Sequence, residues 1–161
     1  MTIRKTTISD FPKLQEIYAH ARSEMIKNGN PNQWKNISPR EELIINDIKN
    51  GDSYVVLFDE EIVGVFSLIL GKDPTYEVIE GQWLNNEPYG TIHRIASLNK
   101  VKGVFDEAIN FAFTKTKNLR IDTHKDNSIM KHLLKTRGFT YCGIIFLLNG
   151  EPREAYQKVL L

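Results

Sequence analysis

The stretch YGTIHRIASLNKVKGVFDEAINFAFTKTK, from Tyr89 to Lys117, decides the fold. Its first part, Thr91 to Ser97, predicts an apolar strand, and a short basic turn follows at residues 98–100. Apolar residues then recur with helical spacing from Val101 to Ala112. The sequence therefore predicts a strand, a tight turn and an amphipathic helix at the centre of the chain.

The start of this helix predicts a phosphate-binding site. Gly103 lies in the expected first turn, and Lys100 and Lys102 lie beside it. The first amides of a helix have no partner within it, a glycine lets a ligand approach closely, and lysines add positive charge. The alternative is that the glycine only allows close packing and that the lysines are solvated. We expect a phosphorylated ligand here.

Length and composition predict one domain, spanning residues 1–161, of an ordinary globular class. The 21 basic and 20 acidic residues nearly cancel, so a nucleic acid is not expected as the partner. The single cysteine, Cys142, excludes an internal disulfide and fits a reducing compartment. No apolar run is long enough for a membrane span, and the first residues lack the pattern of a signal peptide. We expect a cytoplasmic protein that does not bind a membrane.

The remaining apolar patterns surround this central unit with further strands and helices. The expected strands are Thr2–Thr6, Tyr54–Phe58, Ile62–Leu70, Tyr76–Ile79, Leu119–Thr123, Phe139–Leu148 and Ala155–Leu160. The expected helices are one capped by Ser9 that begins near Phe11 and ends at Asn28–Gly29, one over Arg40–Asn50 and one over Asn127–Arg137. A single mixed α/β sheet with helices on both faces satisfies this order.

Several of these segments together resemble one known family. Strand Thr91–Ser97, the helix with Gly103, strand Leu119–Thr123, and helix Asn127–Arg137 followed by Gly138–Phe139 are similar to those of the GCN5-related N-acetyltransferases, the GNAT family. The resemblance implies the acyl-CoA N-acyltransferase fold, in an uncharacterised bacterial branch. It also implies acetyl-CoA as the cosubstrate, bound where the central strand and the next parallel strand splay apart.

The resemblance also implies which residues hold acetyl-CoA. The pantetheine arm would pair with the backbone of the central strand, and the pyrophosphate would lie on the loop before the helix. The cofactor-binding residues are then Ile95, Ala96, Ser97, Lys100, Lys102, Gly103, Val104 and Asn127. Phe105 stands where the family has a small residue, and we interpret it as a core residue of its own helix.

Acetyl transfer to an amine requires a base, because an ammonium must lose its proton near neutral pH. His93 is the first candidate, since it lies on the central strand just before the expected pantetheine contacts and histidine titrates near neutrality. Asp122 is the second candidate, on the next strand. The structural alternatives are a packed histidine and an ion pair of Asp122 with Arg120 or Arg94.

The leaving thiolate requires an acid, and the acceptor requires a pocket. The family often places a tyrosine as the acid where this chain has Leu134, so Tyr141 is the remaining candidate. Trp34 and Glu87 lie in polar loops and are expected to contact the acceptor. The four histidines are scattered, so no metal site is expected.

These observations predict a GNAT-type acyltransferase. It would transfer acetyl from acetyl-CoA to a primary amine of a small molecule or peptide by direct attack. The alternative is a sensor that binds acetyl-CoA, or an interaction domain on the same fold without catalysis. The identity of the amine and the oligomeric state, including a homodimer, stay open at this point.

Overall fold

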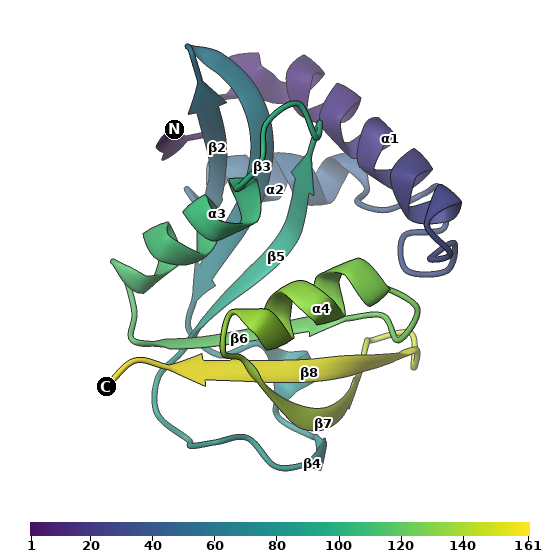
Figure 1. Cartoon of the computed structure of the whole chain (residues 1–161), viewed down its shortest axis with the longest axis vertical. Coiled ribbons are helices and arrows are strands. Elements are labelled where there is room, and N and C mark those ends of the chain that lie inside the picture. Colours follow the sequence, from purple (N-terminus) through teal and green to yellow (C-terminus); the bar gives the residue numbers. More distant parts are fainter.

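The structure is a computed structural model that describes residues 1–161, and its strands form one mixed sheet (Figure 1). Their order is β1-β2-β3-β5-β6-β8-β7-β4, and only the pair β5–β6 is parallel. The strands are β1 Thr2–Lys5, β2 Ser53–Phe58, β3 Glu61–Leu70, β4 Glu80–Gly81, β5 Gly90–Ser97, β6 Asn118–Thr123, β7 Thr140–Phe146 and β8 Pro152–Val159. The helices are α1 Phe11–Lys27, α2 Glu41–Lys49, α3 Val104–Phe113 and α4 Ser128–Thr136, and two 3-10 turns are η1 Ile8–Asp10 and η2 Pro74–Tyr76. The predicted mixed α/β fold is confirmed.

The helices cover the two faces of the sheet in pairs. In Figure 1, α3 and α4 lie in front of the strands, and α1 and α2 lie behind them. The apolar stripe of α3 is buried as its spacing predicts, through Val104, Ala108, Ile109 and Ala112. On the other face, α1 and α2 bury a separate cluster, which includes Leu14, Ile17, Tyr18 and Ile44. The two helix pairs therefore exclude water from both faces.

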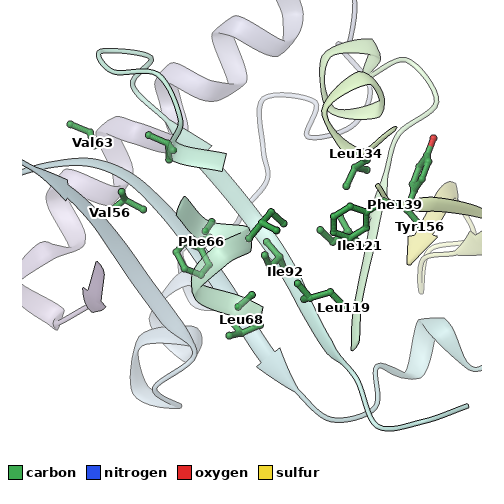
Figure 2. Close-up of a cluster of buried hydrophobic side chains, with 14 residues drawn as sticks. Val56, Val63, Phe66, Leu68, Ile92, Leu119, Ile121, Leu134, Phe139 and Tyr156 are labelled. Atoms are coloured by element: carbon green, nitrogen blue, oxygen red, sulfur yellow. The ribbon is translucent and has the colours of Figure 1, made fainter. Parts of the chain in front are cut away.

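The largest core cluster joins the two halves of the sheet beneath α3 and α4. Figure 2 shows Phe66 and Leu68 of β3 beside Ile92 of β5, with Leu119 and Ile121 of β6 on the far side of Ile92. All five side chains are at most 3% exposed. Leu134 of α4 and Phe105 of α3 also contact this cluster, so Phe105 is packed against the core as predicted.

Strands β5 and β6 pair over a very short length and then separate. Their ladder contains only Gly90 with Leu119 and Thr91 with Arg120. On its other side, β5 changes register against β3 between Val65 and Ser67, and Arg94 there takes a positive φ of 52°. The bulge bends β5 away from β6, because an extra residue in one strand increases its local bend and twist. The splay that the resemblance implies is therefore present.

Two predicted elements near the site differ from the observed ones. Tyr76–Ile79 is not a strand, because Pro74 begins a 3-10 turn and the Asp73 carboxylate accepts a hydrogen bond from the Thr75 amide at 2.9 Å. The helix α3 begins at Val104, and Gly103 precedes it as the N-cap residue with a φ of +92°. Val101 therefore lies in the loop and not on the helix.

The first helix also starts differently from the prediction. Ser9 lies inside the 3-10 turn, and Asp10 is the N-cap residue of α1. The Asp10 carboxylate accepts a hydrogen bond from the Thr7 amide at 2.8 Å and forms an ion pair with Arg4. The carboxylate binds the amide because it is the stronger acceptor of the two candidate side chains.

Candidate active site

Three cavities meet at the splay between β5 and β6. The largest, of about 750 Å³, reaches the loop before α2 and the β7–β8 turn, and we call it the large cavity. A second cavity of about 400 Å³ lies at the start of α3, and we call it the helix cavity. A third, of about 190 Å³, lies toward the end of α1. Ile95 on β5 lines all three, so the site has one junction with three branches.

The helix cavity is bordered by free backbone donors. The first hydrogen bond of α3 runs from the Glu107 amide to the Gly103 carbonyl, and the amides of Val104, Phe105 and Asp106 donate none within the protein. Gly103 reaches its φ of +92° without strain, because it lacks a Cβ atom. Donors of this kind, at the positive end of a helix dipole, suit a phosphate group.

Most of the predicted acetyl-CoA residues border this junction. Six of the predicted residues line the helix cavity, namely Ile95, Ala96, Ser97, Lys102, Gly103 and Val104. Asn127 caps α4 by accepting a hydrogen bond from the Met130 amide, and it lines the other two cavities. Lys100 lines none of the three, because its ammonium pairs with Glu61 at 2.7 Å. The structure therefore brings seven of the eight predicted residues to the junction.

His93 lines the large cavity and is held by a carboxylate. Its Nε2 lies 2.8 Å from Asp73 Oδ2. Burial would raise the pKa of Asp73, but hydrogen bonds from His93 and Thr75 outweigh burial and lower it to about 2. An ionised carboxylate can only accept, so Nε2 carries the proton of this bond and Nδ1 is left free as a base. An aspartate that orients a histidine in this way is typical of acid–base sites.

Asp122 lines the same cavity and is bound to a tyrosine, not to an arginine. Its Oδ1 accepts a hydrogen bond from the Tyr76 hydroxyl at 2.5 Å. Burial, followed by the Asp122 charge, raises the pKa of Tyr76 well above its usual range. The two predicted partners are engaged elsewhere, since Arg120 stacks on Trp83 and Tyr89 and Arg94 pairs with Asp47.

The other predicted site residues have different positions. Trp34 lines the large cavity. Glu87 does not, because its loop packs on Asn118 at the opposite end of β6. Tyr141 lines none of the three cavities and is 52% exposed, with its ring against Tyr156. Glu87 and Tyr141 are thus placed away from the junction.

Sequence reasoning missed three residues that the structure places in or beside the site. Asp73 lies in a Gly–Lys–Asp–Pro segment that we interpreted only as the end of a strand. Aspartate before proline also indicates a turn that the aspartate side chain caps. Arg153 and Asp47 carry no local signal, because their partners lie far away in the chain. Only the folded sheet brings them close.

Replacing Asp73 by asparagine should lower the free energy of unfolding at pH 7 by about 2 kcal/mol. The Asp73 pKa is lower in the folded protein than its usual value of 3.8, so this stabilisation is present above pH 3.8 and is lost as the pH falls through about 2. Urea unfolding of both proteins at pH 7 and at lower pH values measures the difference. The control Asp126→Asn removes a more exposed carboxylate, 3.6 Å from His124, and should change stability less. Equal stability of Asp73→Asn and the unchanged protein at pH 7 would contradict the expectation.

Two structural features bear on other classes of site. No group of three or more His, Cys, Asp or Glu side chains is arranged to hold a metal ion. None of the helices has both the length and the hydropathy that a membrane crossing requires.

Comparison with known proteins identifies the family. No protein-family model and no curated protein matches the chain. Among solved structures, it is similar to a GNAT-family acetyltransferase from Streptococcus agalactiae 2603, with 32% identity, a TM-score of 0.89, and coverage of 99% of this chain and 95% of that one. An acetyltransferase from Staphylococcus aureus Mu50 (21% identity, TM-score 0.71, both chains fully covered) has the same fold. So has a ribosomal-protein-alanine N-acetyltransferase from Brucella melitensis (20% identity, TM-score 0.62, 99% and 100% covered). The chain belongs to the GNAT family of acetyltransferases.

Proposed function

We propose that this acetyltransferase moves an acetyl group from acetyl-CoA to a primary amine of a small molecule or peptide, by direct attack and in the cytoplasm. The observation that carries the proposal is the junction at Ile95. One branch offers free amides at the start of α3, and another offers His93 with its carboxylate partner. A phosphorylated acyl donor and an amine can therefore approach the same point from two sides.

The residues of the helix cavity fit acetyl-CoA, the proposed acyl donor. The amides of Val104, Phe105 and Asp106 would hold its diphosphate, with Lys102 as the neighbouring cation. The β6-facing edge of β5 has no strand partner beyond Thr91, which leaves backbone groups for the pantetheine arm. When bound, acetyl-CoA supplies an acetyl group activated as a thioester.

The residues of the large cavity would prepare the amine. His93 Nδ1 takes the proton from the ammonium, and Asp73 fixes the ring and stabilises the resulting imidazolium. Asp122 lies on the adjacent strand and would attract the ammonium before it loses the proton. Holding both reactants at one junction supplies much of the acceleration, because orientation removes the entropic cost of their encounter.

Cys142 supports direct transfer without a covalent intermediate on the protein. The thiol is 7% exposed and lies in the cluster of Tyr76 and Trp83, outside the three cavities. Burial raises the pKa of Cys142, which disfavours the thiolate that a nucleophile requires.

Acetyl-CoA should stabilise the protein, and replacing Gly103 by valine should weaken that effect. A ligand at a hundred times its Kd raises the free energy of unfolding by about 2.7 kcal/mol. Valine at a φ of +92° is strained by about 1–2 kcal/mol, so the turn should shift and the Kd should rise about tenfold. Calorimetric titration of acetyl-CoA measures the Kd directly, and thermal unfolding with and without ligand measures the stabilisation.

The matched control for Gly103→Val is Gly71→Val. Gly71 also has a positive φ, of +115°, but it lies after β3 and outside the three cavities. This variant should lose stability and keep the original Kd. Equal weakening in the two variants would indicate general misfolding and remove the helix start from the site.

Thiol release separates the enzyme from a sensor on the same fold. Free CoA is measured while a panel of primary amines and short peptides is added with acetyl-CoA. An enzyme releases CoA in proportion to the acetylated amine. Stabilisation by acetyl-CoA with no release for any amine would favour the sensor.

A further inference from the structure

Arg153 is a buried cation on the wall of the large cavity. It lies on β8, its side chain is 5% exposed, and it lines the same cavity as His93 and Asp122. A charge in such a position is costly unless it is paired or binds a ligand. The site as described so far gives Arg153 no role.

No carboxylate of the protein lies within hydrogen-bonding distance of this guanidinium. Its Nη1 donates to the Pro152 carbonyl at 2.9 Å and its Nη2 to the Gln33 carbonyl at 3.2 Å. The nearest carboxylate oxygen, from Glu151, is 3.8 Å away, beyond hydrogen-bonding distance. Glu151 is itself bound by Lys35. Arginine has five N–H donors in a planar fork, so donors remain for an anion.

Strand register places Arg153 on the same face of the sheet as Asp122. Asp122 on β6 pairs with Ala155 on β8, and Arg153 lies two residues before Ala155. Side chains two apart on a strand point to one face, and diagonal neighbours across a pair lie about 7–8 Å apart. The positive group and the negative group therefore face one cavity a short distance apart.

His93 is connected to Asp122 within the same cavity. Tyr76 connects the two residues, because its hydroxyl is bonded to Asp122 and its ring centroid is 6.2 Å from that of His93. The free Nδ1 of His93, the Asp122 carboxylate and the Arg153 guanidinium thus all line the large cavity.

We propose that the acceptor is an amino acid, a small molecule that carries a carboxylate as well as the amine. Arg153 holds the carboxylate through its free donors, and the amine lies at Asp122 and His93. This inference rests on the proposed function and narrows its substrate class. Charges of opposite sign on the cavity wall orient such a molecule, whereas an amine without the carboxylate leaves the remaining donors of the buried guanidinium without an anion.

The test compares matched acceptors with the unchanged protein. L-leucine, L-phenylalanine and L-serine are each assayed beside their amides and their decarboxylated amines, and γ-aminobutyrate is assayed beside butylamine. CoA release gives kcat/KM, corrected for the fraction of free amine at the assay pH. We expect at least one acid to exceed both of its analogues by about 10- to 150-fold, mainly through KM, because a hydrogen-bonded charge contributes that much.

Two variants locate this preference. Arg153→Gln should remove it by lowering kcat/KM for the acid and leaving the values for amides and amines nearly unchanged. Arg153→Lys should keep part of it. Lys49→Gln removes an equal charge from an exposed position outside the cavity and should keep all of it. If the Arg153 variants fail to fold, the comparison of acceptors with the unchanged protein decides alone.

The outcomes separate this inference from the proposed function. Amides or amines used as well as the acids, or a preference that persists in Arg153→Gln, would overturn the inference and leave the N-acetyltransferase intact. A preference for peptides over amino acids would also overturn it. No CoA release with any amine would overturn both.

Discussion

Replacing His93 by glutamine should lower kcat/KM for amine acetylation by about 10²- to 10⁴-fold, the range that a positioned base contributes. In the unchanged protein His93 Nε2 lies 2.8 Å from Asp73. Glutamine retains an N–H donor for Asp73 but cannot accept a proton as the free Nδ1 of histidine does. The pH dependence of kcat/KM should also change, because the variant lacks the base. CoA release between pH 5.5 and pH 9 measures both effects.

Three measurements separate loss of the base from loss of structure. The Kd of acetyl-CoA should be unchanged in His93→Gln, because His93 lies in the large cavity and not in the helix cavity. Asp73→Asn should lose less activity than His93→Gln, since it disturbs only the orientation of the ring. His132→Gln changes an exposed histidine on α4 and should have no effect. An unchanged pH profile in His93→Gln would exclude His93 as the base.

Replacing Arg94 by methionine should destabilise the protein by about 3–5 kcal/mol, the cost of leaving one charge of a buried pair without its partner. The guanidinium donates two hydrogen bonds to Asp47, at 2.7 and 3.0 Å, and the Asp47 side chain is 8% exposed. Only the Ser67 hydroxyl would remain on that carboxylate. For a chain of this size the loss corresponds to a decrease in Tm of about 6–20 °C. Urea unfolding measures it.

Two control variants test the cause of this loss. Arg137→Met breaks a pair with the same short distance of 2.7 Å, but Asp106 is 43% exposed there, so the loss should be at most about 1 kcal/mol. Removing both charges with Arg94→Met and Asp47→Leu should restore much of the stability, because no buried charge is then left alone. Equal losses in Arg94→Met and Arg137→Met would refute this account.

Arg94 also connects stability to the site. It is the residue with a positive φ at the bulge of β5, and its carbonyl accepts a hydrogen bond from the Tyr18 hydroxyl at 2.9 Å. Asp47 and Tyr18 therefore hold a backbone conformation that a non-glycine residue rarely adopts. Ile95 follows immediately, so the ion pair fixes the strand that forms the junction of the cavities.

The sequence was most informative where the signal was local, and it misled where two local signals competed. The period of α3 predicted its buried stripe, and the helix expected over Asn127–Arg137 is α4, for which Asn127 is the N-cap residue. Tyr76–Ile79 alternates like a strand, but a proline and the capping carboxylate of Asp73 form a turn first. The start of α3 was misplaced by three residues, because Val101 has the apolar character of the stripe while its backbone precedes the cap.

The partners of charged residues could not be predicted. The alternation of β6 correctly put Arg120 and Asp122 on one face, but it could not show that Arg120 would lie between two aromatic rings. His93 was identified as a candidate because histidine titrates near neutrality. Its carboxylate partner is 20 residues earlier in the chain and is positioned only by the turn after β3. Pairings of this kind depend on tertiary structure, for which the local pattern carries no information.

The two-pair ladder between β5 and β6 has a mechanical consequence. It divides the backbone hydrogen bonding into two four-stranded blocks, β1-β2-β3-β5 and β6-β8-β7-β4. These blocks are held together mainly by the packed side chains of one apolar cluster. An acyl donor that forms hydrogen bonds with the open edge of β5 on one side, and contacts α4 on the other, would take the place of a missing strand. Occupancy of the gap would then stiffen the protein along the seam between its two blocks.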